Sequence, residues 1–166
     1  MNGDFEEPLS GLPFDWVLDR IRGASTEIVA TGADQNHALR VVFHATEVPY
    51  RHVFQTLLLP SGRYQFSGEV RAELRNERGM QWTIRCADSD ELLGSSERVA
   101  GKLSWQIFDM TFEVRAARNC RAQVLRLELA ARIPAEQQAA GTIWYDNLVI
   151  GRASAEPVPM AQSRPR

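Results

Sequence analysis

The sequence has little cysteine, no long apolar segment and almost no charge excess. Its two cysteines, Cys86 and Cys120, are too few for a disulfide-dense framework and form no CxxC metal motif, which leaves one bridge or two small buried side chains as alternatives. The 19 Lys and Arg nearly balance the 21 Asp and Glu, so the chain lacks the basic surface that binds nucleic acid. No apolar run approaches the ~18 to 20 residues that cross a bilayer, which predicts no membrane insertion.

Sequence motifs of catalysis are also missing. The three histidines, His37, His44 and His52, show no HxH or HExxH spacing for a metal. There is no GxSxG elbow or phosphate-binding glycine loop, and neither cysteine stands in a nucleophile context. A carboxylate pair for glycoside hydrolysis requires a separation of ~5 to 9 Å that only the fold defines. We therefore expect a domain that is not an enzyme.

Alternation of apolar and polar side chains is the clearest pattern in the chain. Over 64–74 the even positions are apolar or small and the odd positions are polar, and over 80–86 the even positions are again apolar. A period of two places successive side chains on opposite faces of a β-strand. Both segments are therefore predicted strands with one buried face, and Trp82 is a predicted core residue. The turn-like segment 75–79 lies between them, so we interpret the two strands as a hairpin.

The same period over 123–131 favours a strand there, because a helix would space its apolar residues three and four apart. The predicted strands are 14–20, 27–31, 39–45, 52–59, 64–74, 80–87, 92–98, 105–114, 123–131 and 142–150. Many short strands with no convincing amphipathic helix predict an all-β fold, an antiparallel β-sandwich of the jelly-roll type. We assign residues 2–151 to this domain. Residues 152–166, rich in proline and small side chains, are predicted to form a flexible tail.

The polar faces of these strands form the candidate ligand surface. The polar positions are Gln65, Ser67, Glu69, Arg71, Glu73, Gln81, Thr83, Arg85, Arg126 and Glu128. Amide, carboxylate and guanidinium groups pair well with the hydroxyls of a sugar. We predict that Glu69, Arg71, Gln81 and Arg85 face one shared groove and bind a ligand. A solvated outer face that binds nothing is the alternative explanation of the same residues.

An aromatic platform would complete such a surface, because an aromatic ring stacks on the apolar face of a pyranose. Trp144 and Tyr145 are adjacent, so one of the two rings must leave the core face of its strand. A tyrosine tolerates exposure through its hydroxyl, and Tyr145 is therefore the predicted ligand-binding platform. Trp16, Tyr50, Trp105 and Trp144 are further candidates.

The two ends of the chain carry a family resemblance. The opening Asn-Gly-Asp-Phe-Glu at 2–6 with Trp16, and the ending Trp-Tyr-Asp-Asn-Leu-Val-Ile at 144–150, resemble the first and last strands of bacterial carbohydrate-binding modules of the family 4, 9 and 22 type. Short sequence motifs similar to those of the same modules occur at residues 53–55, 60–68, 105–108 and 112–114. The resemblance implies a galactose-binding-domain-like jelly roll. The opening, with 11–16, also looks like domains at the C-terminal end of bacterial tetratricopeptide-repeat proteins.

This resemblance implies a non-catalytic module that binds a poly- or oligosaccharide. It also implies a structural calcium between Glu6 and Asp146, with loop oxygens near Asp34 and Asn36 as further ligands. Alternatively, the two carboxylates hydrogen-bond to backbone or to an arginine at the sheet edge. We expect the parent protein in the cell envelope or secreted, although no signal peptide opens this chain. The competing function is a protein-interaction or structural sandwich domain of a larger envelope protein.

Overall fold

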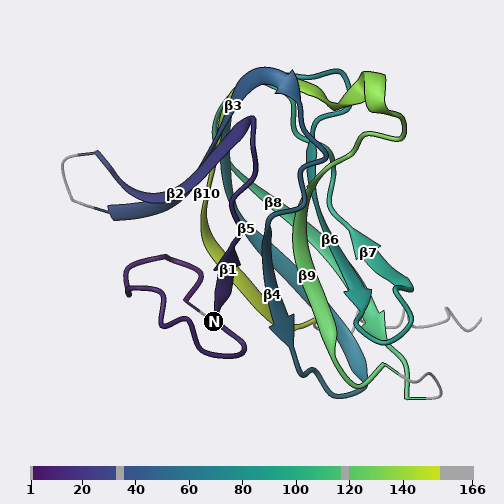
Figure 1. Cartoon of the computed structure of the whole chain (residues 1–166). Helices are drawn as coiled ribbons and strands as arrows, with labels where there is room; N and C mark the ends of the chain where they lie inside the picture. The colour runs from purple at the N-terminus through teal and green to yellow at the C-terminus, as the bar shows by residue number, and fades with distance from the viewer. Residues whose placement is uncertain (1, 33–35, 117–119, 154–166) are drawn as a thin grey trace, which may run out of the picture.

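The chain folds into two facing antiparallel sheets of five strands each (Figure 1). The computed structural model describes residues 2–32, 36–116 and 120–153. Sheet A contains, in spatial order, β1 (Trp16–Leu18), β4 (Val53–Leu57), β9 (Gln123–Leu129), β6 (Met80–Cys86) and β7 (Leu92–Ser95). Sheet B contains β2 (Ala24–Thr31), β3 (Asn36–Glu47), β10 (Gln138–Arg152), β5 (Gly62–Arg75) and β8 (Gly101–Val114). A short 3-10 helix, η1 (Pro134–Gln137), precedes β10.

The all-β sandwich predicted from the alternating pattern is confirmed, and each of the ten predicted strands overlaps an observed strand. The predicted hairpin is wrong. β5 pairs with β10 and β8 in sheet B, whereas β6 pairs with β9 and β7 in sheet A. The turn between β5 and β6 therefore crosses from one sheet to the other. An alternating pattern identifies which face of a strand is buried. It does not tell whether two strands are neighbours in one sheet or face each other across the core, because both arrangements bury the same faces.

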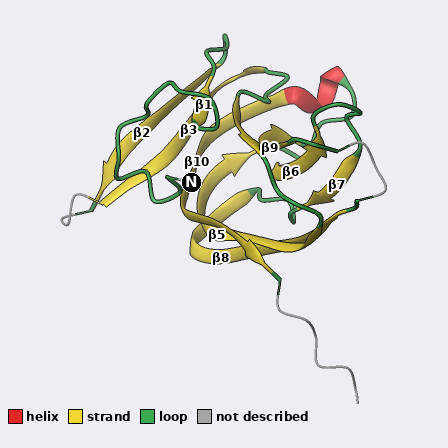
Figure 2. Ribbon diagram, turned by 90° about the horizontal axis from the view of Figure 1, so that it is seen from below, coloured by secondary structure: helices red, strands yellow, loops and turns green. Residues whose placement is uncertain are grey.

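The two sheets face each other (Figure 2), and the hydrophobic core between them includes Trp82. The Trp82 side chain is fully buried, as its phase in the strand predicted. Its ring lies 5.7 Å from Trp16, 5.5 Å from Phe66 and 5.3 Å from Tyr145, measured between ring centroids. The contacts with Phe66 and Tyr145 are edge-to-face, and such contacts add to the free energy of apolar burial. Residues from both sheets thus pack on one indole.

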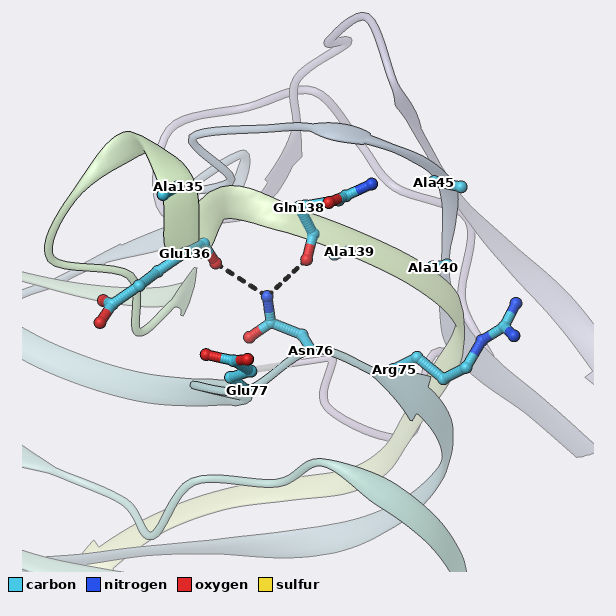
Figure 3. A pocket seen from close by; sticks show the side chains of 9 residues that line it. All are labelled: Ala45, Arg75, Asn76, Glu77, Ala135, Glu136, Gln138, Ala139 and Ala140. Carbon is cyan, nitrogen blue, oxygen red and sulfur yellow. Dashed lines mark hydrogen bonds between the residues drawn. The ribbon is translucent and has the colours of Figure 1, made fainter.

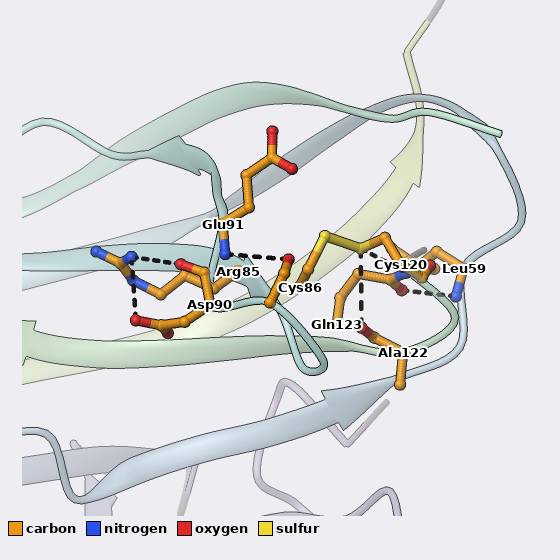
Figure 4. The surroundings of a disulfide bond; sticks show 9 residues. Leu59, Arg85, Cys86, Asp90, Glu91, Cys120, Ala122 and Gln123 are labelled. Atoms are coloured by element: carbon orange, nitrogen blue, oxygen red, sulfur yellow. Dashed lines mark hydrogen bonds and ion pairs between the residues drawn. A yellow bond between two sulfur atoms is a disulfide. The ribbon is translucent and has the colours of Figure 1, made fainter. Parts of the chain in front are cut away.

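A disulfide closes one end of sheet A. Cys86 at the end of β6 and Cys120 ahead of β9 are bridged, with their Cα atoms 5.1 Å apart (Figure 4). The amide of the neighbouring Gln123 is buried and donates to the backbone carbonyl of Cys120 at 3.0 Å. Of the two alternatives that the sequence left open for the cysteines, the structure has the bridge.

The last strand extends slightly past the predicted domain boundary. Arg152 pairs with Tyr64 within sheet B, and the amide of Ala153 donates to the carbonyl of Arg63. Residues 154–166, the rest of the predicted tail, lie outside the described residues. Within the described part of the chain, no helix has the length and apolar character needed to cross a membrane.

Candidate functional site

The sheet order separates the residues that were predicted to share one groove. Gln81 and Arg85 lie on β6 and point outward from sheet A, whereas Glu69 and Arg71 lie on β5 and point outward from sheet B. The prediction of one shared groove is therefore wrong, because it depended on β5 and β6 being neighbours. Each pair instead belongs to its own outer surface, and the two surfaces are on opposite sides of the sandwich.

The outer face of sheet A is the more shielded of the two. Cross-strand pairing places Phe54, Arg126 and Thr83 in one row and Glu128 and Gln81 in the next. The side chains in these rows are half-buried, and Thr83 is only 1% exposed although it faces outward. On sheet B, by contrast, the outward side chains of β5 at positions 65, 71, 73 and 75 are exposed. Neighbouring side chains on the outer face of sheet A therefore cover one another from solvent.

Arg126, at the centre of this face, has hydrogen-bonding capacity that the described protein groups do not use. Its guanidinium carbon lies 5.9 Å from the centroid of the Phe54 ring. Among the described residues it forms no hydrogen bond or ion pair, and its Nε is buried without a partner. The hydroxyl of the adjacent Thr83 is also buried without a partner. Arg126 is half-buried, and no N–H group of its guanidinium bonds a described protein group, so the accessible part of the guanidinium is able to donate to a ligand that carries oxygen atoms.

Flanking residues of sheet A are held in place by bonds to one another. The Gln81 amide donates to the Glu128 carboxylate at 3.2 Å. Arg85 donates to the backbone carbonyl of Asp90 at 2.9 Å, which keeps it at one end of the face. These contacts position an amide, a carboxylate and a guanidinium around the central row, so the predicted Gln81 and Arg85 lie on one surface.

His52 lies just ahead of β4. Burial lowers its pKa, Asp19 opposes this effect, and the positive charges of Arg51 and Arg126 lower the pKa further. A lowered pKa favours the neutral imidazole, which both donates and accepts hydrogen bonds. Its Nδ1 accepts from the backbone amide of Arg51 at 3.0 Å, so the Nε2–H of the neutral ring adds one donor to this end of sheet A.

Tyr145 does not serve as an exposed platform. It is only 1% exposed and packs its ring against Trp82, and burial raises the pKa of its hydroxyl. Trp144 is the ring that points away from the core. It lies on the outer face of sheet B, where it pairs with Arg71. The reasoning that one of two adjacent rings must face outward was sound, but the choice between them was wrong. Trp16 and Tyr50 are buried as well.

Glu6 and Asp146, the predicted calcium ligands, lie near the start of β3, where Glu6 contacts His37 and Asp146 contacts Asn36. Glu6 accepts hydrogen bonds from the backbone amide of His37 at 2.7 Å and contacts the His37 Nδ1 at 2.9 Å. The backbone bond is the main reason that the pKa of Glu6 is lowered. Asp146 accepts from the Asn36 amide at 2.7 Å and from the backbone N–H of Asn147 at 2.6 Å. Burial raises the pKa of Asp146 against these bonds.

These contacts do not make an oxygen cage for a cation. N–H groups of the protein donate to oxygens of both carboxylates. Within the described residues, no three or more His, Cys, Asp or Glu side chains group as metal ligands. The backbone partners match the alternative in which Glu6 and Asp146 bond within the protein. Asp34, named as a further ligand, lies outside the described residues. Calcium binding stays a prediction of the resemblance.

A cavity of about 530 Å³ lies at one end of the sandwich, between the turn after β5 and η1 (Figure 3). Its wall includes Ala45 and Ala139, with Asn76 at its centre. The Asn76 amide donates to the carbonyls of Glu136 and Gln138 at 2.9 and 2.8 Å. Its oxygen accepts from the backbone amides at 78 and 79. The Asn76 amide is therefore used up in local structure, and the side chains of Arg75, Glu77 and Gln138 are the other polar groups that line the cavity.

Sequence reasoning missed Phe54 and underrated Arg126. Phe54 stands between two inward-facing residues, Val53 and Gln55, so the period-two rule places its ring outside. That signal was present in the sequence. The central position of Arg126 was not, because the order of strands in sheet A is set by pairings between distant segments.

Comparison with known proteins gives matches at the level of structure. No family model matches the chain, and no curated protein matches it. A CBM4 structure superposes with a TM-score of 0.62 at 17% identity, covering 92% of this chain and 99% of that chain. The CBM22-1 xylan-binding domain of Paenibacillus barcinonensis Xyn10C gives 0.58 at 15% identity, covering 93% and 94%.

An enzyme shares the same architecture. The Stig cyclase Fisc from Fischerella sp. TAU, in complex with (3Z)-3-(1-methyl-2-pyrrolidinylidene)-3H-indole, gives a TM-score of 0.63 at 15% identity, covering 93% of this chain and 96% of that chain. At such identities the likeness concerns the fold and leaves the chemistry of each protein its own. The chain therefore has the galactose-binding-like jelly-roll fold that carbohydrate-binding modules of the CBM4 and CBM22 type also have.

Proposed function

We propose that this domain is a non-catalytic carbohydrate-binding module that binds a poly- or oligosaccharide across the outer face of sheet A. The observation that carries the proposal is Arg126, a half-buried cation at the centre of the face that has no hydrogen bond or ion pair among the described residues. Sugar hydroxyls supply the acceptors that such a group lacks. The Phe54 ring beside it offers an apolar surface to a pyranose.

The rest of the face supports the same ligand class. Gln81 and Glu128 provide a donor and acceptor pair, and His52 and Arg85 lie at the periphery. A five-stranded sheet has neighbouring strands ~4.8 Å apart, so the surface spans several sugar units. The likeness to CBM4 and CBM22 structures adds a fold-level argument. Among the described residues of this face, none has the pairing of nucleophile and base that covalent catalysis requires, so we propose binding without catalysis.

We also propose that the domain belongs to an envelope or secreted protein. The Cys86–Cys120 bridge supports this location, because such bonds form and persist mainly in oxidising compartments.

The test is calorimetric titration with xylohexaose, cellohexaose and a galactan oligomer, carried to about 10 mM because a ~1 mM Kd corresponds to only ~4 kcal/mol. We expect at least one oligosaccharide to bind, and Arg126→Gln to weaken it by about tenfold, or ~1.4 kcal/mol. Because Arg126 forms no hydrogen bond or ion pair with any described residue, the variant should keep the parent's free energy of unfolding to within about 1 kcal/mol. Arg63→Gln, an exposed position on β5, is the matched control and should bind as the parent does.

Two outcomes contradict the proposal. Silence of the parent with all three oligosaccharides at that concentration would favour the competing protein-interaction function. Equal weakening by Arg63→Gln and Arg126→Gln would show that the bound sugar does not lie on sheet A.

A further inference from the structure

A second surface with the groups that a sugar ring requires lies on the opposite side of the sandwich. Arg71 projects outward from β5, and its guanidinium carbon stacks 4.7 Å from the centroid of the Trp144 ring. A single contact of 3.3 Å joins it to Glu73. The stacking holds the guanidinium flat, and most of its five N–H donors stay available. The Arg71 guanidinium is therefore held in place while its N–H donors are still able to bond a ligand.

A β-bulge directs a second indole to the same place. β5 and β8 pair at Val70 with Gln106 and at Ala72 with Leu103, so two residues of β8 oppose the single residue Arg71. These two residues are Ser104 and Trp105. An extra residue in one strand re-aims its side chains, and bulges of this kind are frequent beside binding sites. Trp105 is 38% exposed, which is high for a large aromatic ring in a strand.

Between these groups lies a cavity of about 260 Å³ lined by Arg71, Glu73, Lys102, Leu103, Ser104 and Trp105. Arginine and lysine only donate, glutamate only accepts, and serine does both. Among the described residues, neither Lys102 nor Ser104 uses its side chain in a hydrogen bond or ion pair. The volume is below the ~300 to 1,000 Å³ typical of drug-sized pockets, so the space suits a single ring.

We propose that this cavity is a second carbohydrate subsite, which binds one pyranose ring against Trp105. The lining has two cations and one carboxylate, a formal charge of +1. Its mixed donors and acceptors, beside one exposed indole, match a ring that has hydroxyls on its edge and C–H groups on its face. Because the cavity lies on sheet B, it is independent of the face around Arg126. A domain with subsites on both outer faces is able to hold two glycan chains at once, and bivalent attachment strengthens retention on a polysaccharide surface.

The test uses two-dimensional NMR of the indole N–H groups, of which the chain has four. The probes are the methyl β-glycosides of xylose, glucose and galactose, each titrated to about 100 mM so that a Kd in the ~1 to 10 mM range is reached. Trp105→Phe assigns the Trp105 signal. We expect at least one glycoside to shift that signal along a saturable curve.

Two variants and their controls locate the site. Arg71→Gln should weaken the saturable shift by about tenfold, equivalent to ~1.4 kcal/mol, whereas Arg63→Gln on the same strand should leave it unchanged. Ile107→Ala, which removes a 76% exposed apolar side chain two residues from Trp105, should also leave it unchanged. Arg126→Gln separates the two proposals, because it should impair oligosaccharide binding on sheet A and spare the Trp105 signal.

Absence of a saturable shift with all three glycosides would overturn the second subsite, as would a shift that persists at full strength in Arg71→Gln. Loss of the shift in Arg126→Gln would also overturn it, because the Trp105 signal would then depend on the opposite face.

Discussion

Removal of the Cys86–Cys120 bridge should lower the stability of the domain by an amount that follows from the length of the loop it closes. The two residues are 34 positions apart, and the loop-entropy relation for a crosslink of that size gives about 3.8 kcal/mol at 25 °C. The double variant Cys86→Ala, Cys120→Ala should therefore lower the free energy of unfolding by roughly 3 to 4 kcal/mol. For a domain whose total stability is of the order of 5 to 15 kcal/mol, that is a large fraction.

Urea denaturation followed by tryptophan fluorescence measures this loss. The transition midpoint should fall, and the m-value should rise, because the unfolded chain without a crosslink exposes more surface. The parent protein under a reducing agent is the matched control, since it loses the same bond and keeps both sulfur atoms. The two measurements should agree to within about 1 kcal/mol, the size of a small change in buried apolar volume.

Two results would refute the reasoning. A loss below about 1 kcal/mol would mean that closing this loop adds native-state strain that offsets the entropy. Free thiols counted by mass spectrometry in the denatured, unreduced parent would show that the bridge does not form.

Two further predictions concern the core and the chain ends. Trp82→Ala should lower the free energy of unfolding by ~3 to 5 kcal/mol because it leaves a cavity in the core. Arg85→Ala should lower it by under about 1 kcal/mol because the Arg85 contacts are near the surface. Equal small effects of the two variants in urea denaturation would mean that the faces of β6 are reversed. If Glu6 and Asp146 hold calcium, millimolar calcium should raise the Tm relative to EDTA by mass action, and Glu6→Gln should abolish the difference. Superimposable melts of the parent would mean that the N–H partners of the carboxylates take the ion's place.

The sequence by itself determined which residues form strands and which face of each strand is buried. Alternation in β5, β6 and β9 is a local property, because successive side chains in an extended chain point to opposite sides. It placed Trp82 in the core and all ten strands near their observed positions. The motifs at the two ends of the chain also predicted the jelly-roll architecture.

Only the tertiary structure decided which strands are neighbours, and the candidate site depends on that. The apolar face of β5 is buried equally well whether β6 is its neighbour in one sheet or faces it across the core. No local pattern therefore distinguishes these two arrangements. The sheet order separates Arg71 from Gln81 and brings Arg126 between Phe54 and Thr83. Likewise, the period-two rule required one of Trp144 and Tyr145 to face outward, and the packing of Tyr145 on Trp82 selected which one. Surfaces made from distant segments are defined by pairings that local periodicity does not encode.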